Sequence, residues 1–396
     1  MDSLVSSKMS HSPKTVGIIT IWQADNYGAE LQAYALQEKL NRIGVECENI
    51  DFPFYKNPDF HKFRCRRSEY SIGWRNCLKE IIFPFLRGLR GRKNCQLEQK
   101  RVQRFQDFYR LTRHSKKRYL SVQELYATPP QYDVYVTGSD QVWNPRIPIA
   151  HGPFFLDFAS PEAPRIAYAS SFGVEKLPPQ AERFFRQWLT AYSHISVREQ
   201  SGVELIRKLT GKEAVHVLDP TLLLTADEWA KIASPIESPE PYLLLYDLLP
   251  SEPILTFSRK LATRNNWKIY RLCRESGQTA ESGIRQFPAA GPQDFLGLFR
   301  NSSYVVTNSF HGTVFSIVFE KEFRVLIPEK MKNHGRISSL ARMLQLESNI
   351  LLENHKGIDI DFDREAERMT DFKPIRELLE KHRHDSENYL RMALGV

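Results

Sequence analysis

His311 and Gly312 stand at the start of a predicted buried helix, where a side chain and free backbone groups could do chemistry. Residues 305–319 are apolar almost throughout, which predicts a strand and then a buried helix. Asn308 or Ser309 is placed to cap that helix, and the free N–H groups of a helix N-terminus attract an anion. A lone histidine is more often structural, but this position favours an acid–base role for His311.

Two arginines stand at similar junctions. Arg198 closes a predicted strand and precedes a helix, so its guanidinium could fork onto a carboxylate or a phosphate. The alternative is a plain ion pair with Glu199 or Asp219. Arg336 begins another predicted helix, either as a second anion clamp or as an ordinary surface arginine.

Two further segments offer groups that suit a sugar. Asp25, Asn26 and Gly28 lie between a predicted strand end and a helix, although a simple capped turn would look the same.

The other segment, 137–144, also follows a predicted strand. It places Asp140, Gln141 and Asn144 beside Trp143, where carboxylate and amides could bind hydroxyls and the ring could stack on a pyranose. A capped turn with a buried tryptophan is the alternative.

The elements that position these residues alternate between short apolar runs and helical patterns. A strand at 15–22, a helix with apolar residues every third or fourth position to Leu40, and a strand at 45–51 form a βαβ unit. Strands are also predicted at 132–137, 165–169, 194–197 and 215–218, with helices at 180–191 and 199–209.

A segment with three prolines, 234–241, separates this series from a second one. We therefore expect an α/β fold with two Rossmann-like, doubly wound domains facing a cleft, at 1–235 and 241–362. Open parallel sheets bind ligands at the carboxyl ends of their strands. A charged helical tail, 363–396, follows, and it could pack back on the first domain.

Positive charge is concentrated in one segment. The 396-residue chain carries a formal charge of +8, but residues 61–118 hold eighteen Lys and Arg against four acidic residues, a local +14. The remainder is therefore mildly acidic, at about −6. We predict a basic helical insertion at 58–120 in the first domain, able to attract phosphates of nucleic acid, anionic lipid or substrate.

Several classes of protein are disfavoured. No apolar run approaches the roughly 20 residues that span a bilayer, and the N-terminus lacks a secretory signal pattern. Five scattered cysteines without a CxxC pair indicate reduced thiols and a cytoplasmic location. The histidines form no HExxH and no Cys/His cluster, so we expect no metal site.

Taken together, five blocks resemble the polysaccharide pyruvyl transferase family. From about residue 15 to 345, interrupted by the basic segment, they are NYGA and LQAYAL from Asn26, GSDQVWN from Gly138, SVRE from Ser196, VLDPT from Val217 and TNSFHG from Thr307. The resemblance implies a GT-B-like fold. It also implies a reaction in which phosphoenolpyruvate donates a pyruvyl group to two sugar hydroxyls, with a cyclic ketal and phosphate as products.

The resemblance also implies residue roles. His311 matches the catalytic histidine and Arg198 matches an arginine that binds the donor. Relatives often carry an arginine two residues before the histidine, where this chain has Ser309. Arg336 is our candidate replacement.

The reaction needs a proton for the donor's methylene carbon and a base for the attacking hydroxyl. It also needs cationic or N–H groups that bind the two anionic groups of the donor. We assign His311 as acid and base and Asp25 as a base for the acceptor. The expected donor contacts are Arg198, Arg336, Ser309, Asn308 and Gly312. The expected acceptor contacts are Asn26, Tyr27, Asp140, Gln141 and Asn144. We expect no metal and no cofactor, with phosphoenolpyruvate as co-substrate.

The basic segment, 61–118, interleaves cations with Trp, Phe and Leu, which suits an anionic membrane surface. The expected acceptor is then a glycan on a polyprenyl carrier, and the expected location is the cytoplasmic face of the inner membrane. A solvated helical insertion is the alternative. The alternative functions are a nucleotide-sugar glycosyltransferase, although GxGxxG is absent, and a nucleic-acid-binding protein. We expect no nucleic-acid partner, because no nucleic-acid module is present elsewhere in the chain.

Overall fold

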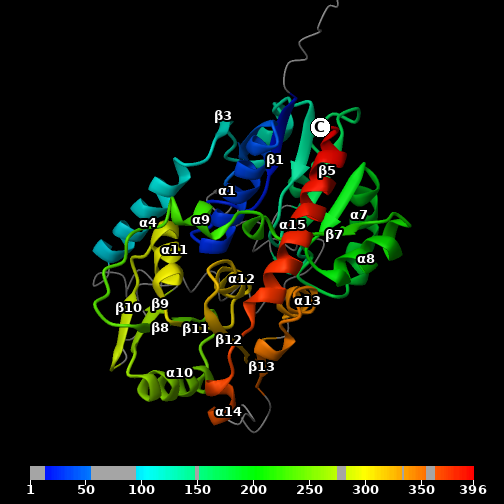
Figure 1. Cartoon of the computed structure of the whole chain (residues 1–396). Coiled ribbons are helices and arrows are strands. Elements are labelled where there is room, and N and C mark those ends of the chain that lie inside the picture. The colour runs from blue at the N-terminus through cyan, green and yellow to red at the C-terminus, as the bar shows by residue number, and fades with distance from the viewer. Residues whose placement is uncertain (1–13, 55–94, 148–150, 274–281, 332–333, 354–361) are drawn as a thin grey trace, which may run out of the picture.

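The computed structural model describes residues 14–54, 95–147, 151–273, 282–331, 334–353 and 362–396. Within them the chain forms two sheets with only parallel strand pairs, one of seven strands and one of six. Figure 1 shows the first sheet in the upper half and the second in the lower half, with α11 and α12 between them. The predicted architecture of two doubly wound α/β domains is confirmed.

The N-terminal sheet has the strand order β3-β2-β1-β4-β5-β6-β7. Its strands are β1 (Thr15–Ile19), β2 (Glu46–Asp51), β3 (His114–Arg118), β4 (Val134–Thr137), β5 (Arg165–Ser170), β6 (His194–Val197) and β7 (Val215–His216). Its helices are α1 (Tyr27–Arg42), α4 (Cys95–Tyr109), α5 (Val122–Ala127), α6 (His151–Phe154), α7 (Pro179–Thr190), α8 (Gln200–Thr210), η2 (Pro220–Leu222) and α9 (Ala226–Ala230).

The C-terminal sheet has the order β10-β9-β8-β11-β12-β13. Its strands are β8 (Tyr242–Tyr246), β9 (Lys268–Leu272), β10 (Ile284–Phe287), β11 (Tyr304–Thr307), β12 (Glu322–Ile327) and β13 (Ile350–Leu352). The helices of this half are α10 (Glu252–Asn265), α11 (Pro292–Asn301), α12 (Phe310–Val318), α13 (Gly335–Met343), η3 (Glu347–Asn349) and α14 (Phe362–Glu367). Every residue of α12 is buried, as its continuous apolar sequence predicts.

The last helix, α15 (Phe372–Leu394), returns to the N-terminal half (Figure 1). Tyr389 donates from its hydroxyl to the carbonyl of Ala167 in β5 at 2.9 Å. Ser386 accepts from the backbone N–H of Leu218 at 3.1 Å. The tail therefore ties the two halves of the chain together.

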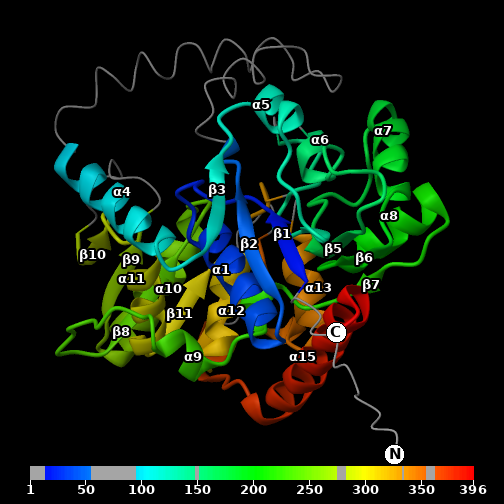
Figure 2. The same cartoon turned by 90° about the horizontal axis from the view of Figure 1, so that it is seen from above.

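The two halves also share one apolar core. Tyr27 of α1 packs on Phe105 of α4, on Phe295 of α11 and on Tyr246 of β8, with ring centroids 5.0–6.1 Å apart. Figure 2 shows α4 beside α11, on the side of β9 and β10. Such a buried aromatic contact resists rotation of one domain against the other.

The basic segment differs from the predicted helical insertion in its last part. Residues 95–109 are helical, but 114–118 form strand β3, which pairs with β2 at the edge of the sheet. Only Ser115 of this strand is buried, so the sequence HSKKR carries no apolar signal for a strand. Residues 55–94, the larger part of the predicted insertion, lie outside the described residues.

Each sheet reverses its strand order at one point, between β1 and β4 in the first sheet and between β8 and β11 in the second. Such switch points leave a crevice at the carboxyl ends of the strands. The chemistry-bearing segments after β1, β4 and β11 lie at these crevices, and the segment after β6 lies at the carboxyl edge of the same sheet, two strands from β4.

Candidate functional site

Arg198, directly after β6, is the centre of a buried charge cluster. Its Nη1 donates to Oδ2 of Asp219 at 2.6 Å and its Nη2 donates to Oδ1 of Asp140 at 3.0 Å. The Arg198 and Asp219 side chains have no exposed surface. The guanidinium also lies over the ring of Phe310, 4.8 Å from its centroid. In this state Arg198 is neutralised by two carboxylates, so the ion pair with Asp219, the simpler of its two predicted roles, is present.

Asp219 is held from several sides. Its Oδ1 accepts from the backbone N–H and hydroxyl of Thr221, at 3.0 and 2.6 Å, and its Oδ2 accepts from Ser139 at 3.0 Å. Burial raises its pKa, but Arg198, His311 and these hydrogen bonds together lower it to about 2. Asp219 is therefore a fixed negative charge at neutral pH.

His311 lies in the first turn of α12, facing both Asp219 and the start of α1. Its Nε2 is 4.0 Å from Oδ1 of Asp219 and has no hydrogen-bond partner. A Cβ on Gly28 would lie only 1.9 Å from its Nδ1, so the close approach of α1 to the ring requires glycine. Burial lowers the pKa of His311 to about 4, with Arg198 and Arg336 also lowering it and Asp219 opposing them. The imidazole of His311 is therefore neutral at pH 7 in this structure and able to accept a proton.

Arg336, at the N-terminus of α13, reaches the same cluster from the C-terminal half. It lies over Phe310, 5.7 Å from the ring centroid, and its Nε is buried without a hydrogen-bond partner. Burial and the neighbouring Arg198 lower its pKa to about 10, so it stays cationic. An unpaired guanidinium nitrogen of this kind is ready for an anion.

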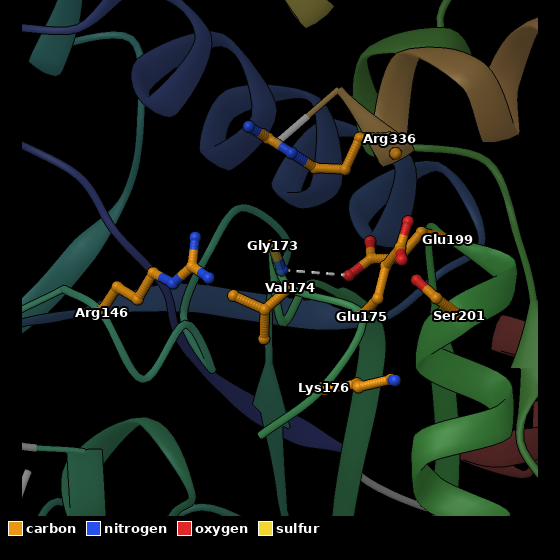
Figure 3. A pocket seen from close by; sticks show the side chains of 9 residues that line it. Arg146, Gly173, Val174, Glu175, Lys176, Glu199, Ser201 and Arg336 are labelled. Carbon is orange, nitrogen blue, oxygen red and sulfur yellow. Dashed lines mark hydrogen bonds between the residues drawn. The ribbon is translucent and has the colours of Figure 1, made fainter. Parts of the chain in front are cut away.

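A pocket of about 360 Å³ opens beside Arg336, between the two halves. Figure 3 shows Arg146, Lys176 and Arg336 around it together with Glu175 and Glu199. Ser201, in the first turn of α8, and Gly335, at the start of α13, also line it. Three cations and two helix N-termini make this pocket suited to a small anion.

Glu199 is a site residue that the sequence reasoning did not assign to the site. It lines the pocket although only 2% of its surface is exposed. Its Oε1 accepts from the hydroxyl of Ser171 and from the backbone N–H groups of Phe172 and Gly173, while its Oε2 has no partner. Burial raises the pKa of this carboxyl, against the opposing effect of Arg198 and Arg336. Its place directly after Arg198 at the end of a strand is the signal that could have identified it.

The predicted acceptor contacts after β4 split into two groups. Asp140 joins the charge cluster through Arg198, and its backbone has a positive φ of 69°. Gln141 accepts from Asn144 at 2.6 Å, and both amides lie against Gly173 at the pocket wall. The tryptophan of this segment, Trp143, is fully buried and stacks on Phe155, so the alternative of a buried core ring holds for it.

The residues before α1 are distributed differently. Asn26 caps α1 by accepting from the N–H groups of Gly28 and Ala29. Asp25 is exposed, and its carboxylate accepts from Tyr109 at 3.4 Å. Tyr27 is 2% exposed within the aromatic core, where its hydroxyl accepts from Arg101 and donates to Ala290. The structure therefore does not bring Tyr27 to the pocket.

The polar residues before α12 have structural partners of their own. Asn308 accepts from the N–H groups of Leu248 and Leu249 and donates to the carbonyl of Leu249, which holds the loop after β8. Ser309 caps α12 by accepting from Gly312 at 3.3 Å. Gly312 packs so closely on Thr307 that a Cβ at position 312 would lie 2.2 Å from Oγ1 of Thr307. These three residues shape the turn that presents His311.

Among the residues that the structure describes, no group of three or more His, Cys, Asp or Glu is arranged to hold a metal ion. Within the same residues no helix is both long and apolar enough to cross a bilayer.

Comparisons with solved structures return low identities. UGT89C1 from Arabidopsis thaliana, complexed with quercetin, is 11% identical with a TM-score of 0.49, over 96% of this chain and 98% of that one. The UDP-GlcNAc 2-epimerase of Methanocaldococcus jannaschii, in complex with UDP-GlcNAc and UDP, is 10% identical with a TM-score of 0.47, over 96% and 99%. The heptosyltransferase WaaC of E. coli with ADP is 10% identical with a TM-score of 0.40, over 93% and 99%.

No curated protein matches the chain. The sequence model of one family does match: the family described as polysaccharide pyruvyl transferase covers residues 26–329. That range includes all of the charge cluster around Arg198 and His311, and Arg336 lies just beyond it.

Proposed function

The chain belongs to the polysaccharide pyruvyl transferase family, and from that premise we propose that phosphoenolpyruvate is its pyruvyl donor. The pyruvyl group passes to two hydroxyls of one sugar in a surface-polysaccharide precursor. The products are a cyclic ketal and inorganic phosphate. No metal takes part in this proposal, because cationic side chains meet both anionic groups of the donor.

The observation that carries the proposal is a pocket lined by three cations, one of which, Arg336, also acts on the buried His311. Phosphoenolpyruvate is small and carries a carboxylate and a phosphate, and the pocket offers Arg146, Lys176 and Arg336 with two helix N-termini. Arg336 comes from the C-terminal half and the other two cations from the N-terminal half. A bound donor would therefore bridge the two domains, with its reacting carbon facing the cluster that contains His311.

His311 is the base for the acceptor hydroxyl in this proposal. It is neutral before the donor binds, because burial and the nearby arginines lower its pKa to about 4. An anionic donor partly offsets the charge of Arg336 and raises that pKa, so the proton taken from the hydroxyl is held more firmly. Asp219, 4.0 Å away, stabilises the imidazolium that forms.

Arg198 has two compatible roles. Its ion pair with Asp219 places that carboxylate opposite His311. The donor contact expected from the family resemblance requires Arg198 to release Asp140, because its side chain has no exposed surface in this state. Donor binding by Arg198 stays a prediction, as do the roles of Asp25 as a base and of Asp140 as an acceptor contact.

The acceptor is proposed to be a glycan on a polyprenyl carrier, with the enzyme bound at an anionic membrane surface. The support is the +14 charge of residues 61–118. Two cations of this segment are engaged with the C-terminal half: the buried Arg101 donates to the carbonyl of Ala290, and the exposed Arg104 pairs with Asp294. Co-sedimentation with anionic and with neutral vesicles tests this part. Equal binding to both vesicles would reject it.

The reaction itself is tested with purified protein, phosphoenolpyruvate and a panel of lipid-linked and synthetic glycosides. Phosphate release must depend on the acceptor, and the acceptor must gain the mass of a pyruvyl ketal. UDP-sugars offered in parallel test for a glycosyltransferase instead. Stabilisation by a UDP-sugar and not by phosphoenolpyruvate, with transfer of the sugar, would overturn the proposal.

A further inference from the structure

The carboxyl of Glu199 is arranged so that its two oxygens face different surroundings. Oε1 accepts three hydrogen bonds, from Ser171 at 3.0 Å, Phe172 at 2.8 Å and Gly173 at 3.3 Å. Oε2 is buried and has no partner, and Glu199 is one of the residues that line the anion pocket. Figure 3 shows the carboxyl within the pocket, with the hydrogen bond from Gly173 to Oε1 drawn.

This asymmetry fits a protonated carboxylic acid. The carbonyl oxygen of an acid accepts hydrogen bonds, and its hydroxyl oxygen carries the proton and donates. All three protein donors are directed at Oε1, so a proton on this carboxyl belongs on Oε2, and the residue that carries it lines the pocket. Burial favours the same neutral form, because it raises the pKa of Glu199.

Glu199 and His311 are thus buried groups of opposite character, and the charge of Arg336 acts on both. The carboxyl is held toward its protonated form and the imidazole toward its neutral form. Pairs of titratable groups whose environments separate them in this way divide the acid and base roles of a reaction.

We propose that Glu199 is the general acid that delivers a proton to the methylene carbon of the donor, while His311 takes the proton of the acceptor hydroxyl. This inference rests on the proposed function, since it assigns one proton transfer within that reaction. It replaces the acid role that the sequence analysis gave to His311, and His311 keeps its role as base.

The proton and electron balance closes over one turnover. The π electrons of the donor's C=C bond take the proton from Oε2 of Glu199, which forms the methyl group and leaves the adjacent carbon cationic. A sugar hydroxyl bonds to that carbon and gives its proton to His311. The C–O bond to phosphate then breaks, phosphate leaves with the electron pair and takes the proton from His311, and the second hydroxyl closes the ketal and reprotonates Glu199.

The charges that face Glu199 act on its proton in both directions. Arg198, Arg336 and the hydrogen bonds from Ser171 and Phe172 favour the carboxylate, whereas burial, the largest effect, favours the acid and raises the pKa. A trianionic donor bound to the pocket cations offsets their charge and so favours the acid further. The other charged groups that line the pocket are Arg146, Lys176 and Glu175.

The test is Glu199→Gln, because glutamine keeps the acceptor oxygen at Oε1 and fills the same volume but has no proton to deliver. Positioned general acids contribute roughly 10²–10⁴-fold, so kcat should fall by that factor. The KM for phosphoenolpyruvate and the melting temperature should stay close to the parent values. Glu204→Gln is the matched control, since Glu204 is an exposed glutamate of α8 that does not line the pocket, and its kcat should change less than threefold.

The pH dependence of kcat gives a readout that a structural role would not move. In the parent enzyme kcat should decline on the alkaline side as Glu199 loses its proton, and Glu199→Gln should lack that limb. If Glu199→Gln keeps kcat within fivefold of the parent, or keeps the alkaline limb, Glu199 is not the acid. If the parent enzyme itself releases no phosphate from phosphoenolpyruvate with any acceptor, the proposed function fails instead.

Discussion

The contact between α1 and the imidazole of His311 makes Gly28→Ala a sharp test of how the fold positions the catalytic group. The added Cβ would lie 1.9 Å from Nδ1, 2.4 Å from Cε1 and 2.5 Å from Cγ of His311. Non-bonded heavy atoms settle at roughly 3.5 Å, so the ring must move by about 1.5 Å or change rotamer. Gly28 has no positive φ, so the backbone itself tolerates alanine.

Two effects of known size follow from this collision. Overpacking a filled core costs roughly 1–3 kcal/mol of unfolding free energy. Displacing a catalytic group by about 1 Å costs roughly 100-fold in rate. That factor equals about 2.7 kcal/mol of activation free energy. The KM for phosphoenolpyruvate should change little, because Gly28 does not line the anion pocket.

The assay is acceptor-dependent phosphate release, with unfolding measured on the same preparations. A double-mutant cycle with His311→Ala separates the two effects, because removing the ring removes the collision. Gly28→Ala should then cost no stability in the His311→Ala background. A folded Gly28→Ala enzyme with kcat within twofold of the parent would refute the positioning argument, and a stability loss that persists without His311 would refute the collision.

Three further predictions concern the other charged groups. Arg336→Met should raise the KM for phosphoenolpyruvate at least tenfold and abolish its thermal stabilisation, and an unchanged KM would remove Arg336 from the donor site. His311 binds protons less readily in the folded state than in the unfolded state, so stability should rise with pH between about 4 and 6.5, by on the order of 3 kcal/mol. His311→Gln should reduce this slope in urea titrations across that pH range, and the remaining slope belongs to other histidines whose pKa is lowered by burial, such as His151 and His216. Arg101→Ala, which removes the buried hydrogen bond to Tyr27, should cost about 3 kcal/mol of unfolding free energy. Arg110→Ala, at a largely exposed ion pair, should cost under about 0.5 kcal/mol, and equal losses in the two variants would contradict the interdomain role of α4.

Local patterns predicted the strands and helices well where the elements are apolar. The strand at 194–197 begins and ends as predicted, and the helix predicted at 199–209 is α8, shifted by one residue. Strand β3 was missed because HSKKR is an edge strand with one buried side chain, and hydrophobic periodicity does not register such a segment.

The site was predicted in part. His311 and Arg336 were identified by their position at the start of helices that follow strands, and the structure brings both to one cluster. Tyr27 was expected among the acceptor contacts, yet it packs into the interdomain core. The direction of a side chain at the start of a helix depends on which other helices pack there. For Tyr27 these are α4 and α11, which are distant from α1 in the sequence.

The amino-acid sequence by itself determined the fold class, the family and the placement of polar residues at strand ends, because short local segments of the chain carry each of these signals. Tertiary structure decided which of those polar residues are paired with other side chains and which keep an atom without a hydrogen-bond partner. Arg198 is neutralised by Asp140, 58 residues away, while Oε2 of the adjacent Glu199 is left without a partner. Burial and through-space charge set these states, and both depend on contacts between the two domains that no local pattern contains.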